Sequence, residues 1–258
     1  MAGPGRTALW YAVAMLRAVT FDFWNTLVAD AHGEERESRR AQIVGDELGA
    51  LGRDFSPLIL DEALRTAFDF FDRVWVAEHR TPLCSELVGT VFRTLGVRPP
   101  DDVAARVVEA FEDLVLEFPP EPMPGAPEIL PLLRERYRLA VICDTGWSPG
   151  RVLRQVLARY GMLDHFEYLF FSNEHGMSKP DARVFHHTLA QLGVRAGEAA
   201  HVGDIQRTDV AGAQAAGMMA AHFVAVNDHD LRHSTADLVA HRFDELPDLL
   251  GGLICPGC

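Results

Sequence analysis

Short apolar runs alternate with helical patterns over the second half of the chain, and this alternation constrains the fold more than any other feature. The pattern predicts helices over 126–136, 149–160, 181–192 and 208–217, and strands over 138–142, 168–171, 199–202 and 219–224. Each strand with its helix spans about 25 to 30 residues, as in a succession of βαβ units. A fifth apolar run, 16–21, stands near the N-terminus. The sequence therefore predicts an α/β protein with a parallel five-stranded sheet and helices on both faces.

A different pattern separates the first strand from the other four. Between residues 34 and 118, apolar side chains recur every three or four positions, which is typical of helices that bury one face. The proline-rich stretch Pro119–Gly125 follows and cannot continue a helix. We therefore expect a discontinuous Rossmann-like core built from 15–30 and 120–258, with a helical domain over 31–119 inserted into it.

Polar residues follow the predicted strands at the points where these strands end. They are Asp22, the segment Cys143–Gly146, Lys179, Asp204 and Asp209. Because the carboxyl ends of parallel strands open into one crevice, we expect these residues to lie together. Carboxylates beside a lysine suit a hard cation such as Mg²⁺ and an anionic substrate. Each residue alone would pass for an ordinary surface residue, and their combination in this order predicts a site.

Four segments resemble the motifs of the haloacid dehalogenase-like (HAD) hydrolase superfamily. In chain order they are FDFWNTL, VICDTG, SKPDARVF and HVGDIQRTDVAGA. The resemblance covers the chain from Leu16 to about Val226. It implies a hydrolase that acts on a small molecule, and it implies that the helices over 31–119 form a C1-type cap.

The resemblance implies a covalent mechanism centred on the first motif. Asp22 would be the nucleophile that attacks phosphorus and forms an aspartyl-phosphate, which splits one displacement into two easier steps. Thr26 would orient Asp22 through its hydroxyl group. Lys179 would hold Asp22 and the transferring group by its charge, and Asp209 would support this lysine or the metal shell.

The same resemblance implies Mg²⁺ as the cofactor. Its ligands would be the carboxylates of Asp22 and Asp204 together with the backbone carbonyl of Trp24. Asn25 takes a place that usually belongs to Gly in the family. Asparagine is among the few residues that accept a left-handed backbone, so we expect that conformation at Asn25.

Trp24 is the first departure from the family pattern. Phosphatases of the family mostly carry Asp two residues after the nucleophile, where it protonates the leaving oxygen and later activates water. An indole offers only a non-titrating N–H. Loss of a general acid costs about 10² to 10⁴ in rate, so we expect slow turnover of ordinary alkyl phosphates unless another group delivers the proton.

Cys143 is the second departure, because the family usually has Ser or Thr there to hydrogen-bond the phosphoryl oxygen. A thiol is a weaker donor, and a small buried residue at the end of a strand is an alternative reading of Cys143. Asp144 stands where Asn is common, and Thr145 offers a neighbouring hydroxyl. We expect Asp144, Thr145 and Gly146, together with Trp24, to contact the substrate.

Three functions from different classes fit these residues. The first is a Mg²⁺-dependent phosphohydrolase. The second is a 2-haloacid dehalogenase, because that branch has an aromatic residue at the place of Trp24 and halide leaves without a proton. Those dehalogenases replace the metal-binding Asp with neutral residues, so Asp204 favours the phosphohydrolase. The third is a weakly active or inactive family member that serves as a binding protein.

The cap would select the substrate, and the sequence only narrows the choice of contact residues. A charge run on an amphipathic helix is usually solvated, and a structural role is the favoured reading of the remaining candidates. The candidates are Arg36, Arg39, Arg40, His79, Arg80 and Trp147.

Composition excludes several classes of partner. The net charge of −13, with 37 acidic against 24 basic residues, argues against nucleic acid or an anionic membrane, because phosphates attract clustered Lys and Arg. No apolar run reaches the roughly 20 residues of a membrane span. The four scattered cysteines do not make a disulfide framework, so we expect a cytoplasmic protein. We expect a phosphorylated small-molecule substrate and a monomer or homodimer.

The two ends of the chain are expected to lie outside the folded unit. The apolar run after Arg6 faintly resembles a signal peptide, but cleavage near Ala18 would remove the first strand. Residues 1–14 are therefore interpreted as a disordered extension, with Met15 as the true start. Cys255 and Cys258 form a lone Cys-x-x-C without a second pair at zinc-site spacing. A frayed tail is the favoured reading of this segment.

Overall fold

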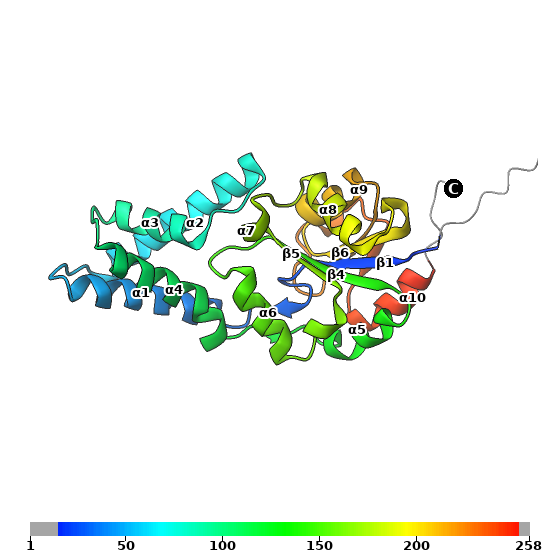
Figure 1. Cartoon of the computed structure of the whole chain (residues 1–258), viewed down its shortest axis with the longest axis horizontal. Coiled ribbons are helices and arrows are strands. Elements are labelled where there is room, and N and C mark those ends of the chain that lie inside the picture. The colour runs from blue at the N-terminus through cyan, green and yellow to red at the C-terminus, as the bar shows by residue number, and fades with distance from the viewer. Residues whose placement is uncertain (1–14, 253–258) are drawn as a thin grey trace, which may run out of the picture.

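A six-stranded parallel sheet forms the centre of the computed structural model, which describes residues 15–252 (Figure 1). The order of strands across the sheet is β5-β4-β1-β6-β7-β8. The strands are β1 (Ala18–Phe21), β4 (Arg138–Cys143), β5 (Tyr168–Phe171), β6 (Ala199–Gly203), β7 (Met219–Phe223) and β8 (Leu238–Ala240). The α/β class and the five predicted strands are confirmed. The edge strand β8 is an addition, because its three residues are too few to give a pattern.

Strand β1 lies between β4 and β6 and pairs with both along its whole length. All four residues of β1 are buried, as expected for a strand covered on both faces. From β4 the chain continues outward to β5 and then returns to the other side of β1 with β6. Such a change of direction opens a crevice at the carboxyl ends of the central strands.

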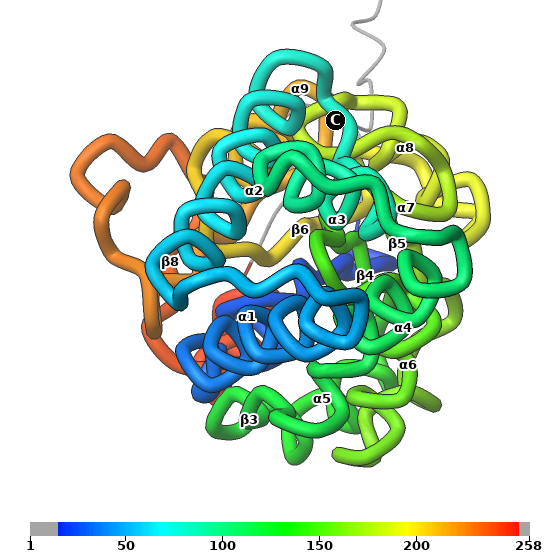
Figure 2. The backbone as a smooth tube through the Cα atoms, turned by 90° about the vertical axis from the view of Figure 1, so that its left-hand side faces the viewer, coloured from blue at the N-terminus to red at the C-terminus, as the bar shows by residue number. Residues whose placement is uncertain are grey.

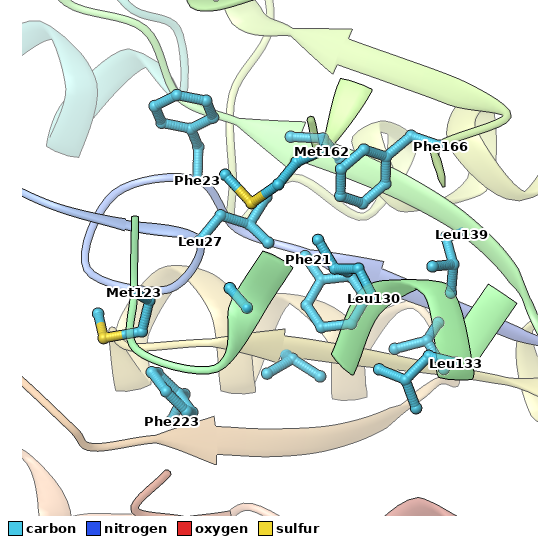
Figure 3. Packing of buried hydrophobic residues seen from close by; sticks show 14 of the residues in the cluster. Phe21, Phe23, Leu27, Met123, Leu130, Leu133, Leu139, Met162, Phe166 and Phe223 are labelled. Carbon is cyan, nitrogen blue, oxygen red and sulfur yellow. The ribbon is translucent and has the colours of Figure 1, made fainter. Parts of the chain in front are cut away.

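Two apolar layers cover the faces of the sheet. One layer contains side chains of α5 (Ala126–Arg134), α6 (Gly150–Arg159) and α10 (Leu246–Gly251), and Figure 3 shows part of its packing. The other contains side chains of α8 (Ala182–Leu192) and α9 (Ala211–Ala215). The predicted helices of this half are thus present, although α9 is preceded by a π-helical turn over Gln206–Val210.

Four helices form a separate bundle beyond the carboxyl ends of the strands (Figure 1). These helices bury an apolar cluster of their own. In Figure 2, which views the molecule from the side of the bundle, they lie in front of the sheet. They are α1 (Gly33–Gly49), α2 (Pro57–Glu78), α3 (Cys84–Thr94) and α4 (Asp101–Glu117). The chain leaves and re-enters the core through a two-stranded antiparallel ladder of β2 (Val28–Ala29) and β3 (Glu121–Pro122).

Short elements complete the fold. They are the helix α7 (Ser172–His175) and the 3₁₀ turns Leu163–His165, Ala196–Glu198, Leu231–His233 and Phe243–Glu245. Between residues 15 and 252, no helix combines the length and apolar character that a membrane crossing requires. The predicted extension 1–14 and the pair Cys255 and Cys258 lie outside the described residues.

Candidate active site

A cavity of about 350 Å³ lies between the carboxyl ends of the strands and the helical bundle. Five polar residues predicted from the strand ends line it: Asp22, Asp144, Lys179, Asp204 and Asp209. Helices α1 and α2 of the bundle supply part of the opposite lining, including Arg36, Phe68 and Trp75. The expected convergence of the strand ends is therefore present, and the bundle contributes to the same cavity.

Lys179 joins two carboxylates at the bottom of the site. Its Nζ lies 2.5 Å from Oδ1 of Asp22 and 2.6 Å from Oδ1 of Asp209, and its side chain is 2% exposed. Burial opposes the charge of the lysine, but the carboxylates of Asp209 and Asp22 outweigh it and raise the pKa of Lys179 well above its usual value. Lys179 is therefore an ammonium ion that holds the two carboxylates together.

Asp209 is fixed by several donors in addition to Lys179. Its Oδ2 accepts from the backbone N–H of Ile205 at 3.0 Å, and its Oδ1 lies 3.2 Å from Nε2 of His201. Burial opposes ionisation of Asp209, but Lys179 and His201 outweigh it and lower the pKa of this carboxyl. Gly203 leaves room for this arrangement, because a Cβ there would lie 2.6 Å from Cβ of Asp209.

His201 was not predicted as a site residue. It is buried in β6, and its Nδ1 lies 2.8 Å from Oγ1 of Thr20 on the neighbouring strand. Because a carboxylate only accepts, Nε2 must donate to Asp209, and Nδ1 then accepts from Thr20. Burial lowers the pKa of His201, consistent with a neutral ring. The signal in the sequence was a histidine within an otherwise apolar strand, two residues before Gly203.

Asp204 supplies the third carboxylate, at the end of β6. Its Oδ2 accepts from the side-chain amides of Asn25 at 3.4 Å and Asn227 at 3.3 Å, and its backbone oxygen accepts from His222 Nε2 at 3.0 Å. Burial and the charge of Asp209 raise the pKa of Asp204 to about 6. Asn25 has a φ of 55°, which confirms the expected left-handed backbone.

The charge balance of this cluster suits a divalent cation. Three carboxylates, Asp22, Asp204 and Asp209, surround the single ammonium of Lys179. Burial first, and then the charges of Asp209 and Asp204, raise the pKa of Asp22 well above its usual value despite the opposing lysine. No group of three or more His, Cys, Asp or Glu side chains within residues 15–252 is arranged as a metal site. The predicted ligands are two carboxylates and one backbone carbonyl, a set that a group of three such side chains does not describe, and bound Mg²⁺ would offset the excess charge.

Of the remaining residues predicted from the first two motifs, some line the cavity and others are buried away from it. Cys143 is fully buried and does not line the cavity, and burial first and then the charge of Asp22 raise its pKa well above the usual value. The Thr145 hydroxyl lies 3.0 Å from Oγ of Ser172, away from the cavity lining. Thr26 makes no hydrogen bond to Asp22 through its hydroxyl, which is buried without a partner among residues 15–252. Gly146 lines the cavity as expected.

Asp144 is held by both halves of the molecule. Its Oδ2 accepts from the indole Nε1 of Trp75 in α2 at 2.8 Å, and its Oδ1 accepts from the backbone N–H of Lys179 at 3.0 Å. The side chain is only partly buried toward the cavity, yet desolvation raises its pKa to about 6 against the opposing charge of Lys179. Trp75 falls within the apolar periodicity between residues 34 and 118, and that pattern gives no sign of a role for its polar N–H.

Half of the six candidates for substrate contact from the helical bundle and its surroundings line the cavity. They are Arg36, Arg40 and Trp147, whereas Arg39, His79 and Arg80 do not. Trp24 is half-buried and also lines the cavity, with the guanidinium of Arg36 5.9 Å from the centre of its ring.

The fold and this cluster together define an α/β protein with a carboxylate and lysine site at the carboxyl ends of a parallel sheet, and comparison with known proteins gives the family. A family model described as haloacid dehalogenase-like hydrolase matches residues 16–217, and the chain belongs to this family. The chain is 30% identical over 209 residues to haloacid dehalogenase-like hydrolase domain-containing protein 3 of Bos taurus, with 79% of this chain and 80% of that protein covered.

Other similar proteins carry the names of different activities. The chain is 27% identical over 237 residues to glyceraldehyde 3-phosphate phosphatase of Methanopyrus kandleri, with 91% and 92% of the two chains covered. The crystal structure of 2-haloacid dehalogenase from Pseudomonas syringae matches with a TM-score of 0.67 at 24% identity, and covers 92% of this chain and 98% of that one. At this identity the structural match shows a shared fold alone.

Proposed function

We propose that the protein is a Mg²⁺-dependent phosphohydrolase that acts on a small phosphorylated molecule through an aspartyl-phosphate at Asp22. The observation that carries this proposal is the carboxylate Asp204, which lines one cavity with Asp22, Lys179 and Asp209 and leaves the cluster with excess negative charge. Similarity to proteins named as phosphatases supports it.

The first step is the attack of Asp22 on phosphorus. Lys179 binds Oδ1, whereas Oδ2 has no hydrogen bond within residues 15–252, so Oδ2 is the free nucleophilic oxygen. The new bond joins Oδ2 to phosphorus as the bond from phosphorus to the leaving oxygen breaks. Bound Mg²⁺, held by Asp22, Asp204 and the carbonyl oxygen of Trp24, would offset the charge of the phosphoryl oxygens. Lys179 keeps Asp22 in place through both steps.

The leaving oxygen needs a proton that Trp24 cannot deliver. We propose that Asp144 delivers it, because this carboxyl lines the cavity and burial raises its pKa to about 6. In the second step, water attacks phosphorus of the aspartyl-phosphate and passes its proton to Asp144, which releases inorganic phosphate and restores Asp22. One carboxyl thus acts first as an acid and then as a base.

We propose that α1 to α4 form a C1-type cap over 31–119 that closes the cavity above a core of 15–30 and 120–258. Trp147 of the core supports this reading, since its ring packs 5.5 Å from Phe68 and 5.3 Å from Phe111 in the bundle. We also propose a cytoplasmic location, which the free and buried thiols of Cys84 and Cys143 support.

A panel of aryl phosphates, alkyl phosphates and acyl phosphates, assayed with Mg²⁺ and with a chelator, tests the proposal. We expect turnover that requires Mg²⁺ and disappears in Asp22→Asn, because an amide is not a nucleophile at phosphorus. An unchanged rate in the chelator would remove the metal from the mechanism. Thermal unfolding of the variant is the control for an intact fold.

Trp24 favours a second candidate, hydrolysis of 2-haloacids. This aromatic side chain lines the cavity where a proton donor is expected, and a halide leaves without a proton. The same Asp22 would attack carbon instead of phosphorus, and no metal would be needed. Release of halide in the chelator would establish this activity. Absence of turnover with the whole panel would favour the third reading, a family member that binds without hydrolysis.

A further inference from the structure

Arg40 in α1 is a buried cation without an anionic partner. Arg40 is 5% exposed, and its guanidinium lies 5.0 Å from the ring centre of Trp147 and 5.9 Å from that of Phe111. Its Nε is buried without a hydrogen bond, and no hydrogen bond or ion pair to another residue between 15 and 252 involves this side chain. Aromatic rings attract the guanidinium, but they do not neutralise it.

Arg36, one turn earlier on the same helix, shows how a buried arginine is satisfied in this region. It forms an ion pair with Asp30 and donates to the backbone oxygen of Phe118 at 2.6 Å. Arg40 has neither kind of partner. Burial and the charge of Arg36 lower the pKa of Arg40 to about 10, so it is still a cation at neutral pH. The charge of Glu37 acts on Arg40 in the opposite direction, but no ion pair joins the two.

The position of Arg40 explains where a partner would come from. Arg40 lines the same cavity as Asp22 and Lys179, although it belongs to the bundle and they belong to the core. The lining around it includes the aromatic side chains of Phe68 and Trp147. A molecule that presents a phosphoryl group to Asp22 therefore extends toward a wall that combines aromatic side chains with Arg36, Arg40 and the carboxylates of Asp30 and Glu37. A buried cation is costly unless an anion pairs with it. Asp30 pairs with Arg36, and no carboxylate among residues 15–252 forms an ion pair with Arg40, so a ligand in the cavity can supply that anion.

We propose that Arg40 binds a second anionic group of the substrate, a carboxylate or phosphate separate from the phosphoryl group that is transferred. The substrate class is then small phosphate esters with at least two anionic groups. A guanidinium suits this role because its planar donors match the oxygens of carboxylate and phosphate. This inference rests on the proposed function for the identity of the transferred group, whereas the anion site itself does not.

Binding of phosphonates separates the two proposals, because phosphonates cannot be hydrolysed at a P–O ester bond. Calorimetry with the full chain and Mg²⁺ compares carboxyethyl phosphonate with propyl phosphonate, which have similar size but differ by one charge. We expect the carboxylated probe to bind about 10- to 100-fold more tightly, the range of a charge-assisted pair. Ethylene bisphosphonate as a third probe shows whether phosphate or carboxylate is the preferred second anion.

Variants of α1 assign this preference to Arg40. In Arg40→Gln we expect the ratio of the two affinities to fall close to one. Arg39→Gln is the matched control, since Arg39 is adjacent, bonds to Gln42 at 2.8 Å and lies outside the cavity lining; it should keep the ratio of the parent. Arg40→Lys, which keeps the charge, should retain part of the preference.

Three outcomes overturn or separate the proposals. A ratio near one in the parent overturns the anion site without any variant, even if Arg40→Gln does not fold. An unchanged ratio in Arg40→Gln also overturns it, because the second anion then binds elsewhere. A preference that depends on Arg40, together with no turnover of any phosphate ester, supports the anion site and refutes the phosphohydrolase.

Discussion

Removal of one N–H from the cavity should shift the pKa of Asp144 in a measurable way. The indole of Trp75 donates to Oδ2 of Asp144 at 2.8 Å, and this bond stabilises the ionised carboxylate. Trp75→Phe deletes the donor but keeps an aromatic ring against Phe71, whose centre is 5.9 Å away, and beneath the guanidinium of Arg207 at 4.3 Å. The substitution therefore isolates the hydrogen bond from the packing.

The size of the shift follows from the strength of such a bond. A hydrogen bond to a charged acceptor contributes about 1.5 to 3 kcal/mol, and one pKa unit corresponds to about 1.36 kcal/mol, so the range is roughly one to two units. Asp144 is partly open to the cavity, where water can replace the indole, so we expect the lower end. The direction is upward, because the lost donor had favoured the charged form. The pKa of Asp144 should rise from about 6 by roughly one unit.

Two measurements test this shift. Carbon-13 NMR of the aspartate carboxyl groups gives the pKa of Asp144 directly, after assignment with Asp144→Asn. If Asp144 donates the proton, turnover of a phosphate with a poor leaving group should fall as pH rises through this pKa. In Trp75→Phe that fall should move to higher pH by the same amount.

Trp147→Phe is the matched control for this experiment. It makes the same chemical change in the same cavity, but the Trp147 N–H makes no hydrogen bond to any residue between 15 and 252, so the pKa of Asp144 should not move. An Asp144 that titrates at the same pH in the parent and in Trp75→Phe would refute the electrostatic argument. A shifted NMR titration with an unshifted rate profile would leave the pKa argument intact and exclude Asp144 as the acid.

Three further outcomes are expected from the site. Asp204→Asn should weaken Mg²⁺ binding at least about tenfold in calorimetry, because it removes one of two ligand charges, and an affinity equal to that of the parent would exclude Asp204 as a ligand. Lys179→Met should abolish turnover and lower the free energy of unfolding by about 3 to 5 kcal/mol in urea, because two buried carboxylates lose their cation; a parent-like midpoint would contradict this. Trp24→Asp should raise turnover of poor leaving groups more than good ones, by up to about 10²-fold, if the absent acid limits the rate, and equal effects across a series of aryl phosphates would rule that limit out.

The central strands were predictable from the sequence, because a strand buried on both faces is a continuous apolar run. Strands β1 and β4 are of this kind, and each is almost fully buried. Strand β8 has three residues, two of them only partly buried, and pairs with one neighbour alone. A run of three residues is too short to show a period, so this edge strand could be identified only in the structure.

The residues at the strand ends were predictable because topology brings them together whatever the details of their side chains. The contacts across the cavity were not, because they depend on how the bundle docks on the core. Arg39 and Arg40 show the difference: they are adjacent and chemically identical, yet Arg39 is half-exposed beside Gln42 and Arg40 is buried against Trp147. A rotation of about 100° per residue along a helix separates them, and only the packing of α1 determines which one faces the cavity.

The differences from the family pattern at Trp24 and at Asp144 can be understood as one change. Trp24 removes an acid from the loop after β1, and Asp144 adds a carboxyl to the loop after β4, where Asn is common in the family. Strands β1 and β4 are neighbours, and both residues line the same cavity. The carboxyl of Asp144 after β4 would thus replace the one that the loop after β1 lacks, and the cavity would keep a proton donor. Because α2 of the bundle supplies the Trp75 bond, and this bond favours the ionised carboxylate, the docking of the bundle on the core influences the pKa of Asp144. Loss of the Trp75 donor should then affect poor leaving groups and leave good ones nearly unchanged, which distinguishes a relocated acid from a missing one.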